Sequence, residues 1–381
     1  MDAISDIIKR TKAYYCLDCG KCTGSCPVSR VNRTYSPRAL LMKTIQNDHN
    51  GVLKDKNLWE CLTCAMCEER CPSAIRYIEF TRDMRIVAHG QGGRGECSHG
   101  GAFQSLMRIQ TTPHLKQNRL DWVTSDLKIS TTKGEVLYFV GCLPYFDAFF
   151  TDLEVRTLDS ARGVVKILNA LKIQPVVMPN ERCCGHDLLW SGDVENFKRL
   201  AQHNLNEIAK IGAKTVIFSC PEGYRTFKED YPRHFGKLGF EVRHISEFLA
   251  PKIAAGQISF NGFNGKVTYQ DPCRLGRHLG IYDPPRQVMK AMSGLELTDM
   301  RHSRNTSVCC GVGNWMGCNA FTKQLQVNRL KEAKATGADL LITACPKCEI
   351  HLKCALHDEK VGQEIQMEIR DLMALAASRL V

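Results

Sequence analysis

Seventeen of the twenty cysteines in this chain fall into four regularly spaced groups. Two of the groups share the pattern Cys-x-x-Cys-x-x-Cys-x-x-x-Cys-Pro and run from Cys16 to Pro27 and from Cys61 to Pro72. A thiolate is a soft anionic ligand for iron, and this spacing is the bacterial ferredoxin run, here present twice. The sequence therefore predicts two cubane 4Fe-4S clusters and, with them, electron transfer.

In a pair of ferredoxin runs, the fourth cysteine of each run binds the cluster of the other run. We therefore expect Cys16, Cys19, Cys22 and Cys71 to hold cubane 1, and Cys26, Cys61, Cys64 and Cys67 to hold cubane 2. Zinc sites prefer paired CxxC motifs separated by a spacer. Disulfides are not expected for cysteines this dense without a secretory signal.

The other two groups belong to two longer units that repeat. In each unit a strand ends in a cysteine, a Cys-Cys-Gly motif follows, and a second strand ends in Cys-Pro; the four predicted strands are Glu135–Cys142, Lys214–Cys220, Lys266–Cys273 and Asp339–Cys345. The two Cys-Cys-Gly motifs are 126 residues apart, and the two Cys-Pro motifs 125. This regular offset indicates an internal duplication. Strands alternating with helical stretches predict parallel α/β units, with ligands at the carboxyl ends of the strands.

The two units differ in the number of their cysteines. The second unit offers five, which are Cys273, Cys309, Cys310, Cys345 and Cys348. Five thiolates exceed the four that a cubane needs, so this unit predicts a more open or larger cluster. The first unit has only Cys142, Cys183, Cys184 and Cys220, because Gly223 stands where the repeat has Cys348. A four-ligand cluster, no cluster and a structural pocket all remain open for it; we favour a lost or altered cluster.

Composition and charge exclude several other classes of protein. The chain has 381 residues, is 44% hydrophobic and 24% charged, and carries a net charge of +11 without a long basic run, so nucleic-acid binding is not expected. We see no secretory segment, no membrane span, no nucleotide-binding G-x-G-x-x-G and no P-loop. Electrons must then come from another subunit. The cysteine count favours a reducing, cytoplasmic, low-oxygen setting.

The predicted fold class is α+β, with a small all-helical ferredoxin domain followed by two duplicated α/β domains. Helices are expected over residues 1–15, 38–46 and 76–87. We place the ferredoxin domain at 1–87, a glycine-rich connecting segment at 88–134, the first duplicated domain at 135–262 and the second at 263–381.

The residues described so far resemble heterodisulfide reductase, through the two ferredoxin runs, CCGHDLLWSGD (183–193), DPCRLGRHLGIYDPPR (271–286), CCGVGNWMGCN (309–319) and CPKC (345–348). The C-terminal two-thirds resembles its catalytic subunit, with two CCG domains, and the first third resembles its small two-cubane subunit. Fused chains of this kind are also similar to iron–sulfur subunits of glycolate or lactate oxidation, anaerobic glycerol-3-phosphate dehydrogenase, sulfite-reduction membrane complexes and class II benzoyl-CoA reductase.

The resemblance implies that the second unit holds a noncubane 4Fe-4S cluster, at which a disulfide reacts. Cys309 and Cys310 would then form the reactive site. His278 and His186 are candidate proton donors, and Arg274, Arg277 and Arg286 candidate anion-binding residues; packing roles stay open for all five. Three cysteines, Cys97, Cys318 and Cys354, fit no group and are expected to be free buried thiols. Cys318 could also line the cavity of the second unit.

Two functions from different classes compete. In the first, the chain is an oxidoreductase subunit that passes electrons from the cubanes to the noncubane cluster and reduces a disulfide. In the second, it is an electron-relay subunit with no substrate of its own. The expected partner is a flavoprotein of the heterodisulfide reductase type, a dehydrogenase or a membrane cytochrome, and the last would bring the chain to a membrane. Zinc-binding scaffolds in the CCG units are a third reading, which leaves the cubanes without an electron acceptor.

Overall fold

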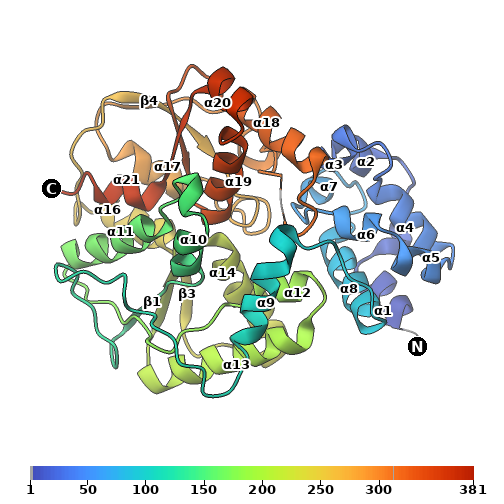
Figure 1. The fold of residues 1–381 in the computed structure, drawn as a ribbon, viewed down its shortest axis with the longest axis horizontal. Coiled ribbons are helices and arrows are strands. Elements are labelled where there is room, and N and C mark those ends of the chain that lie inside the picture. The colour runs from blue at the N-terminus through green and yellow to red at the C-terminus, as the bar shows by residue number, and fades with distance from the viewer. Residues whose placement is uncertain (1–2, 312) are drawn as a thin grey trace.

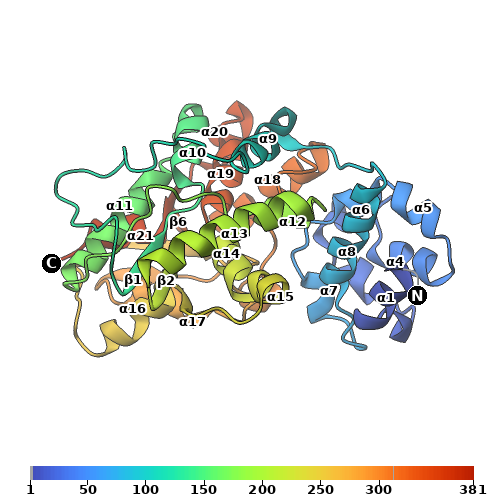
Figure 2. The same cartoon turned by 90° about the horizontal axis from the view of Figure 1, so that it is seen from below.

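The computed structural model describes residues 3–311 and 313–381 and combines one helical region with two parallel sheets. Figures 1 and 2 show the N-terminal helices gathered at one end of the molecule, beside the two α/β units, with the C-terminus at the opposite end. The predicted α+β class is confirmed. None of the helices in the described ranges combines the length and apolar character that a bilayer crossing needs.

The N-terminal region is all helical. Its elements are α1 (Ala3–Arg10), η1 (Ala13–Tyr15), α2 (Lys21–Ser25), α3 (Pro27–Val31), α4 (Pro37–Ile45), α5 (His49–Lys54), α6 (Asn57–Glu60), α7 (Met66–Glu69) and α8 (Tyr77–Gly90). The helices expected over 38–46 and 76–87 are α4 and α8. Ser36 caps α4 by accepting the amide of Ala39 at 3.1 Å. The helix expected over 1–15 ends at Arg10, and Tyr15 is 68% exposed, so Tyr15 is not part of its buried face.

The segment after α8 contains η2 (Ser98–Gly101) and α9 (Ala102–Ile109), followed by an irregular stretch. Phe103 and Met107 of α9 are buried in the core of the first α/β unit. Leu127 is buried in the core that both sheets share. This segment therefore packs over the sheets.

The first α/β unit contains the parallel sheet β1-β2-β3. Its elements are β1 (Val136–Phe139), α10 (Leu143–Phe149), η3 (Thr151–Leu153), α11 (Thr157–Ala170), α12 (His186–Trp190), α13 (Val194–Ile211), β2 (Thr215–Phe218), α14 (Pro221–Arg225), the π-helical turn η4 (Thr226–Asp230), α15 (Tyr231–Phe235), β3 (Glu241–His244) and α16 (Ile245–Ala254).

The second unit contains the parallel sheet β5-β4-β6-β7. Its elements are β4 (Gly265–Gln270), α17 (Asp283–Lys290), β5 (Leu295–Leu297), η5 (Arg304–Thr306), α18 (Ala320–Lys334), β6 (Leu340–Thr343), α19 (Pro346–Leu356), α20 (Glu359–Ile365), β7 (Glu368–Asp371) and α21 (Leu372–Ala377).

Strand pairing brings the cysteines of each unit to one sheet edge. Strand β1 pairs in parallel with β2, and β4 with β6. In each pair, both strands end two or three residues before a cysteine. Because parallel neighbours end at the same edge, Cys142 and Cys220 follow at one edge of the first sheet, and Cys273 and Cys345 at the matching edge of the second. The ends of these parallel strands therefore position the candidate sites.

The three regions share their cores. One buried cluster joins Leu58 and Phe80 of the helical region to Leu325 and Leu341 of the second unit. Another joins Leu137 of the first sheet to Ile350 of α19. Apolar burial stabilises by about 25 cal/mol per Å², so these joint cores hold the regions in a fixed arrangement.

A buried carboxyl at the start of α21 gives a testable pH dependence. Asp371 accepts the amides of Met373 at 2.8 Å and Ala374 at 3.2 Å, and burial raises its pKa to about 6. The native state thus holds this proton more tightly than the unfolded chain, and the free energy of unfolding falls as pH rises from about 4 to about 6. Asp371→Asn keeps the cap and removes this titration. Relative to wild type, it should be stabilised by about 1 kcal/mol more at about pH 8 than at about pH 5.5. Apparent melting temperatures measure this, and an equal difference at both pH values would contradict it.

Candidate metal centres

The four cysteines expected for cubane 1 line one small cavity in the helical region. Cys16, Cys19, Cys22 and Cys71 surround a space of about 30 Å³, into which Cys67 also faces. Cys19 is exposed and the other three are half-buried. The cavity thus lies close to solvent, where an electron donor can approach.

The cysteines expected for cubane 2 lie deeper. Cys26, Cys61, Cys64 and Cys67 are all buried. Burial, with repulsion from Cys64 and Cys61, raises the pKa of Cys26 to about 12, and burial likewise raises the pKa of Cys67. Four mutually repelling buried thiols favour the binding of a cation among them. The structure thus groups Cys26 with the second run, and Cys71 with the first.

Replacing one crossing cysteine tests this pairing. Cys71→Ser should remove about four irons per chain and the electron paramagnetic resonance (EPR) signal of cubane 1, while cubane 2 stays reducible. Cys26→Ser is the matched control, because it should remove the other signal. Loss of the same cluster in both variants would show that the pairing is wrong.

In the second CCG unit, the five predicted cysteines come together at the sheet edge. Cys309, Cys310, Cys345 and Cys348 are buried, and Cys273 is half-buried. Hydrogen bonds from Cys309 and then Cys348 lower the pKa of Cys310 to about 6, against burial. A thiol that ionises this readily is a good metal ligand. Gly311 has φ 101°, and a Cβ there would lie 2.8 Å from the Thr322 carbonyl oxygen, so the Cys-Cys-Gly turn needs glycine.

Two arginines join this unit to the loop of cubane 2. Arg274, next to Cys273, donates to the Thr63 hydroxyl at 2.6 Å and also to the Thr63 carbonyl. Arg277 donates to the Cys64 carbonyl at 2.6 Å. Burial alone would lower the pKa of Arg277, but the thiols of Cys64, Cys273 and Cys309 raise it overall. The two sets of cysteines therefore lie on either side of these guanidinium groups.

The first CCG unit lacks its fifth thiol at Gly223, which lies beside Cys184. A Cβ on Gly223 would lie 3.9 Å from Cys184 Sγ and 3.3 Å from the Phe218 ring. Cys142 Sγ and Cys183 Sγ are 3.5 Å apart. Phe139 and Phe218 end β1 and β2, where the second unit has Gln270 and Thr343 at the ends of β4 and β6. The first unit thus has phenylalanine at the two strand ends where the second unit has polar residues.

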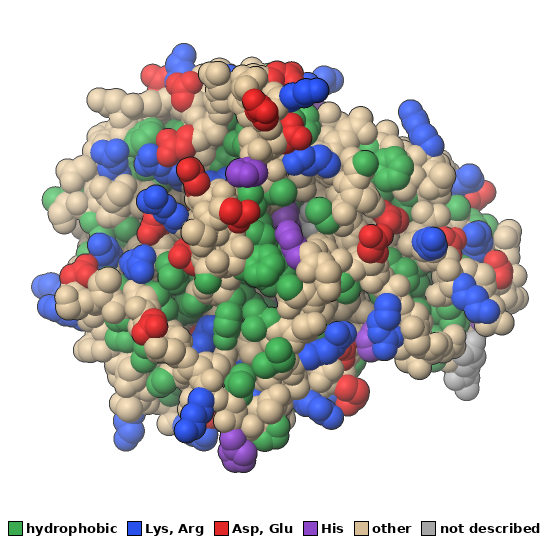
Figure 3. Space-filling model, in the orientation of Figure 1, with side chains coloured by type: hydrophobic (Ala, Val, Ile, Leu, Met, Phe, Trp, Pro, Cys, Tyr) green, Lys and Arg blue, Asp and Glu red, His purple; other side chains and the backbone are tan. Residues whose placement is uncertain are grey.

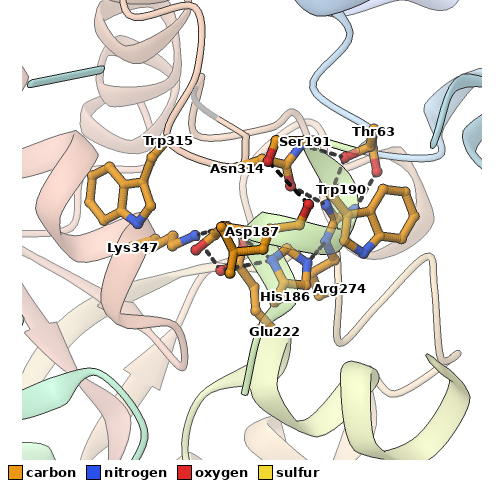
Figure 4. Close-up of polar contacts among 12 residues, drawn as sticks. Thr63, His186, Asp187, Trp190, Ser191, Glu222, Arg274, Asn314, Trp315 and Lys347 are labelled. Atoms are coloured by element: carbon orange, nitrogen blue, oxygen red, sulfur yellow. Dashed lines mark hydrogen bonds and ion pairs between the residues drawn. The ribbon is translucent and has the colours of Figure 1, made fainter. Parts of the chain in front are cut away.

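A buried ion-pair network lies between the two units (Figure 4). The Lys347 ammonium, within the second Cys-Pro motif, is 2.5 Å from Asp187 and 2.6 Å from Glu222. Glu222 occupies in the first unit the position that Lys347 occupies in the second. Among the described residues, His186, Asp187 and Glu222 form the one set of three potential ligands within 4.8 Å of one another, but the Lys347 ammonium already pairs with both carboxylates. This cluster is a structural link between the units.

The two candidate histidines take part in the same network. His186 donates from Nδ1 to Asp187 at 3.0 Å, and its Nε2 accepts from Arg274 at 3.1 Å. His278 Nε2 lies 2.9 Å from the Thr63 carbonyl. Burial lowers the pKa of both imidazoles well below the usual value. These contacts place both residues at the interface between the helical region and the two CCG units. The proton-donor role of His278 stays a prediction.

The remaining predicted residues lie outside this ion-pair network. Arg286 forms a buried pair with Asp271 at 2.7 Å and also reaches Asp299, so these carboxylates already satisfy its charge. Cys97 is half-buried beside η2. Cys318 and Cys354 face a second cavity near the second unit. Cys318 is exposed and Cys354, like Cys97, is only half-buried, so the expectation that these three thiols are buried is wrong.

Several functional residues were not found from the sequence. His351 Nδ1 lies 3.5 Å from Cys310 Sγ. Lys347, Thr63 and Asn314 belong to the interface between the regions. The position of His351, three residues after Cys348 on one helix, was a usable signal because such residues share a face. The partners of Lys347 and Thr63 are more than a hundred residues away, and local spacing does not report such pairs.

Comparisons with known proteins agree with this architecture. The family descriptions that match are a 4Fe-4S dicluster domain over residues 12–75 and a cysteine-rich CCG domain over residues 136–228 and 267–353. One of the subunits of dihydromethanophenazine:CoB–CoM heterodisulfide reductase from Methanosarcina barkeri is 32% identical over 401 residues, covering 96% of this chain and 93% of the relative. The chain belongs to the heterodisulfide reductase family. It is therefore an iron–sulfur oxidoreductase subunit that carries two 4Fe-4S clusters.

Other relatives show how widely chains of this type are used. One of the subunits of fumarate reductase (CoM/CoB) from Methanothermobacter marburgensis is 26% identical over 95% of this chain and 72% of its own length. The probable iron-sulfur-binding oxidoreductase FadF of Bacillus subtilis is 26% identical over 88% of this chain, which spans 55% of FadF. A hypothetical protein from Helicobacter pylori shares the fold, with a TM-score of 0.52 at 11% identity over 99% of this chain and 76% of that structure. The heterodisulfide reductase family thus has relatives that are named for several activities.

Proposed function

We propose that this heterodisulfide reductase relative reduces a disulfide at its second CCG unit, with electrons that reach that unit through cubane 1 and then cubane 2. The observation that carries the proposal is the contact of Arg274 and Arg277 with Thr63 and Cys64. These two arginines follow Cys273 closely in the chain, so the peptide that holds cubane 2 lies against the second unit. A cluster there supplies one-electron steps to a substrate that needs two.

The ligands of the additional cluster would be Cys273, Cys309, Cys310, Cys345 and Cys348, and we propose that it is of the noncubane 4Fe-4S type. The buried thiols and the Gly311 turn provide a site that fits it. His351 and the Arg274 guanidinium lie beside this site and would orient the cysteines around it. We propose an altered cluster or a structural pocket for Cys142, Cys183, Cys184 and Cys220.

Electrons would enter at the exposed edge of cubane 1. Tyr14, Tyr15 and Leu17 are 63%, 68% and 69% exposed around Cys16 and Cys19. Exposed aromatic and leucine side chains of this kind suit a protein interface. The partner would be a flavoprotein, a dehydrogenase or a membrane cytochrome, and the last would hold this chain at a membrane. The site itself would lie in the cytoplasm.

A relay role without a substrate is the second candidate, and the missing thiol at Gly223 favours it. Iron content and reactivity separate the two. Anaerobically purified protein should hold about twelve irons with matching sulfide. A reduced viologen should then be oxidised when the CoB–CoM heterodisulfide, named for the relatives, is added. About twelve irons without any disulfide-dependent oxidation would favour the relay, and about eight irons with bound zinc would favour the scaffold.

A further inference from the structure

Two cysteines outside the four groups share a cavity with a histidine of the second CCG unit. Cys318 and Cys354 line a space of about 20 Å³ together with His99, Trp315 and His351. Both thiols are free; Cys318 is exposed and Cys354 is half-buried. The Cys354 thiol acts electrostatically on Cys318. Both thiols therefore face the same small cavity.

His351 connects this cavity to the second unit. Its Nδ1 lies 3.5 Å from Cys310 Sγ, whereas its buried Nε2 has no hydrogen-bond partner among the described residues. Cys348, His351 and Cys354 follow at three-residue intervals on α19, so they lie along one side of the helix. The Trp315 ring stands at 83° to the imidazole with centroids 5.3 Å apart. The His351 imidazole thus contacts Cys310 and also lines the cavity.

The position of the two cysteines is fixed by packing between α18 and α19. The Lys323 ammonium of α18 donates to the Cys354 carbonyl at 2.8 Å. Asn319, the residue after Cys318, caps α18 by accepting the amides of Phe321 and Thr322. Figure 3 shows histidine and hydrophobic side chains gathered at the centre of one face, between α19 and α9, where the molecule is hollowed. Because Cys318 is exposed, a substrate sulfur can approach it from solvent.

We propose that Cys318 and Cys354 form a redox-active dithiol that takes electrons from the second CCG unit and passes them to an external disulfide. The proposal rests on the electron path of the proposed function, and it places the reaction with the external disulfide at Cys318, while the second unit reduces the Cys318–Cys354 disulfide. In the first half, two electrons and two solvent protons break the Cys318–Cys354 disulfide and give two thiols. In the second half, the Cys318 thiolate attacks the substrate disulfide, forms a mixed disulfide and releases one thiol. Cys354 then attacks Cys318, which releases the second thiol and restores the internal disulfide.

The exposures of the two cysteines assign these roles. The attacking thiol must reach a substrate from solvent, as the exposed Cys318 does, and the resolving thiol needs to reach only its partner. Although the Cys318 side chain is exposed, partial desolvation by neighbouring atoms and then repulsion from Cys354 raise its pKa, and Lys323 acts in the opposite direction. The exchange half-reaction should therefore become faster as pH rises above 7, since the thiolate is the attacking species.

Disulfide trapping in the intact protein tests the dithiol. Cluster-loaded protein is treated anaerobically with diamide, alkylated and analysed by peptide mass spectrometry. A Cys318–Cys354 cross-link is expected in wild type and in Cys97→Ser, the matched control at a half-buried thiol outside the cavity. It should be absent in Cys318→Ser and Cys354→Ser. Reduced viologen should open the cross-link at least about 10-fold faster in wild type than in Cys309→Ser, in which the second unit loses its cluster.

Turnover separates this proposal from the proposed function. Cys318→Ser should lower viologen oxidation by a disulfide at least about 10-fold with unchanged iron content. Unchanged turnover in Cys318→Ser, or no cross-link in wild type, would overturn the dithiol and leave disulfide reduction at the second unit standing. A cross-link that viologen opens, in a wild type that reduces no added disulfide, would instead support the dithiol and show that the supplied disulfides are not its substrates.

Discussion

Cys309→Ser is expected to lower the iron content from about twelve to about eight per chain and to reduce disulfide-dependent viologen oxidation at least about 100-fold. Cys309 is buried, and its thiol contacts the thiols of Cys273 and Cys310. A serine hydroxyl at this position is a poor iron ligand and leaves a buried polar group beside the remaining thiols. The effect on turnover should therefore follow the loss of the cluster, while both cubanes keep their ligands.

Cys183→Ser is the matched variant in the first unit, because the two residues hold the same place in the duplicated motif. The first unit lacks a fifth thiol and has phenylalanine rings where the second has polar side chains. We expect Cys183→Ser to lower the melting temperature and to keep turnover within about 10-fold of wild type. Samples are compared anaerobically at equal cubane content. A folded Cys183→Ser variant as inactive as Cys309→Ser would make the first unit a second working site.

The sequence predicted the parts of this structure that local spacing determines. The two ferredoxin runs, the Cys-Cys-Gly turns and the strands before Cys142, Cys220, Cys273 and Cys345 repeat at fixed intervals. Strands β3, β5 and β7 were not predicted; they are three or four residues long and partly exposed, so they lack the continuous apolar character of β2 and β6. Short edge strands of this kind are stabilised by their neighbours.

The interface between the helical region and the two CCG units could not be predicted in this way. The sequence offered His186, His278 and Arg274 as substrate-binding or proton-donating residues, but their contacts go to Asp187, Thr63 and one another. Which polar side chain is used to hold a buried joint depends on pairs that lie far apart in the chain. The duplication did contain one signal: opposite charges, Glu222 and Lys347, at equivalent positions of the two units.

Lys347→Met is expected to lower the free energy of unfolding by about 3–5 kcal/mol, or the apparent melting temperature by roughly 5–10 °C. Lys347 is 3% exposed, and its ammonium is the cation between Asp187 and Glu222. Methionine keeps the length of the side chain but leaves two carboxylates facing each other in a site that excludes water. Because these residues come from both units, the loss should appear as weakened association of the units.

Two further variants separate the buried charge from other effects of the substitution. Lys331→Met removes a surface ammonium whose pair with Glu364 is about half exposed on both sides, so it should cost at most about 1 kcal/mol. Asp187→Asn and Glu222→Gln, added to Lys347→Met, remove the unpaired anions and should recover a large part of the lost stability. Melting is followed at equal iron content, because Lys347 is adjacent to Cys348. If the triple variant were no more stable than Lys347→Met, or if Lys347→Met melted with Lys331→Met, the network would not be what holds the two units together.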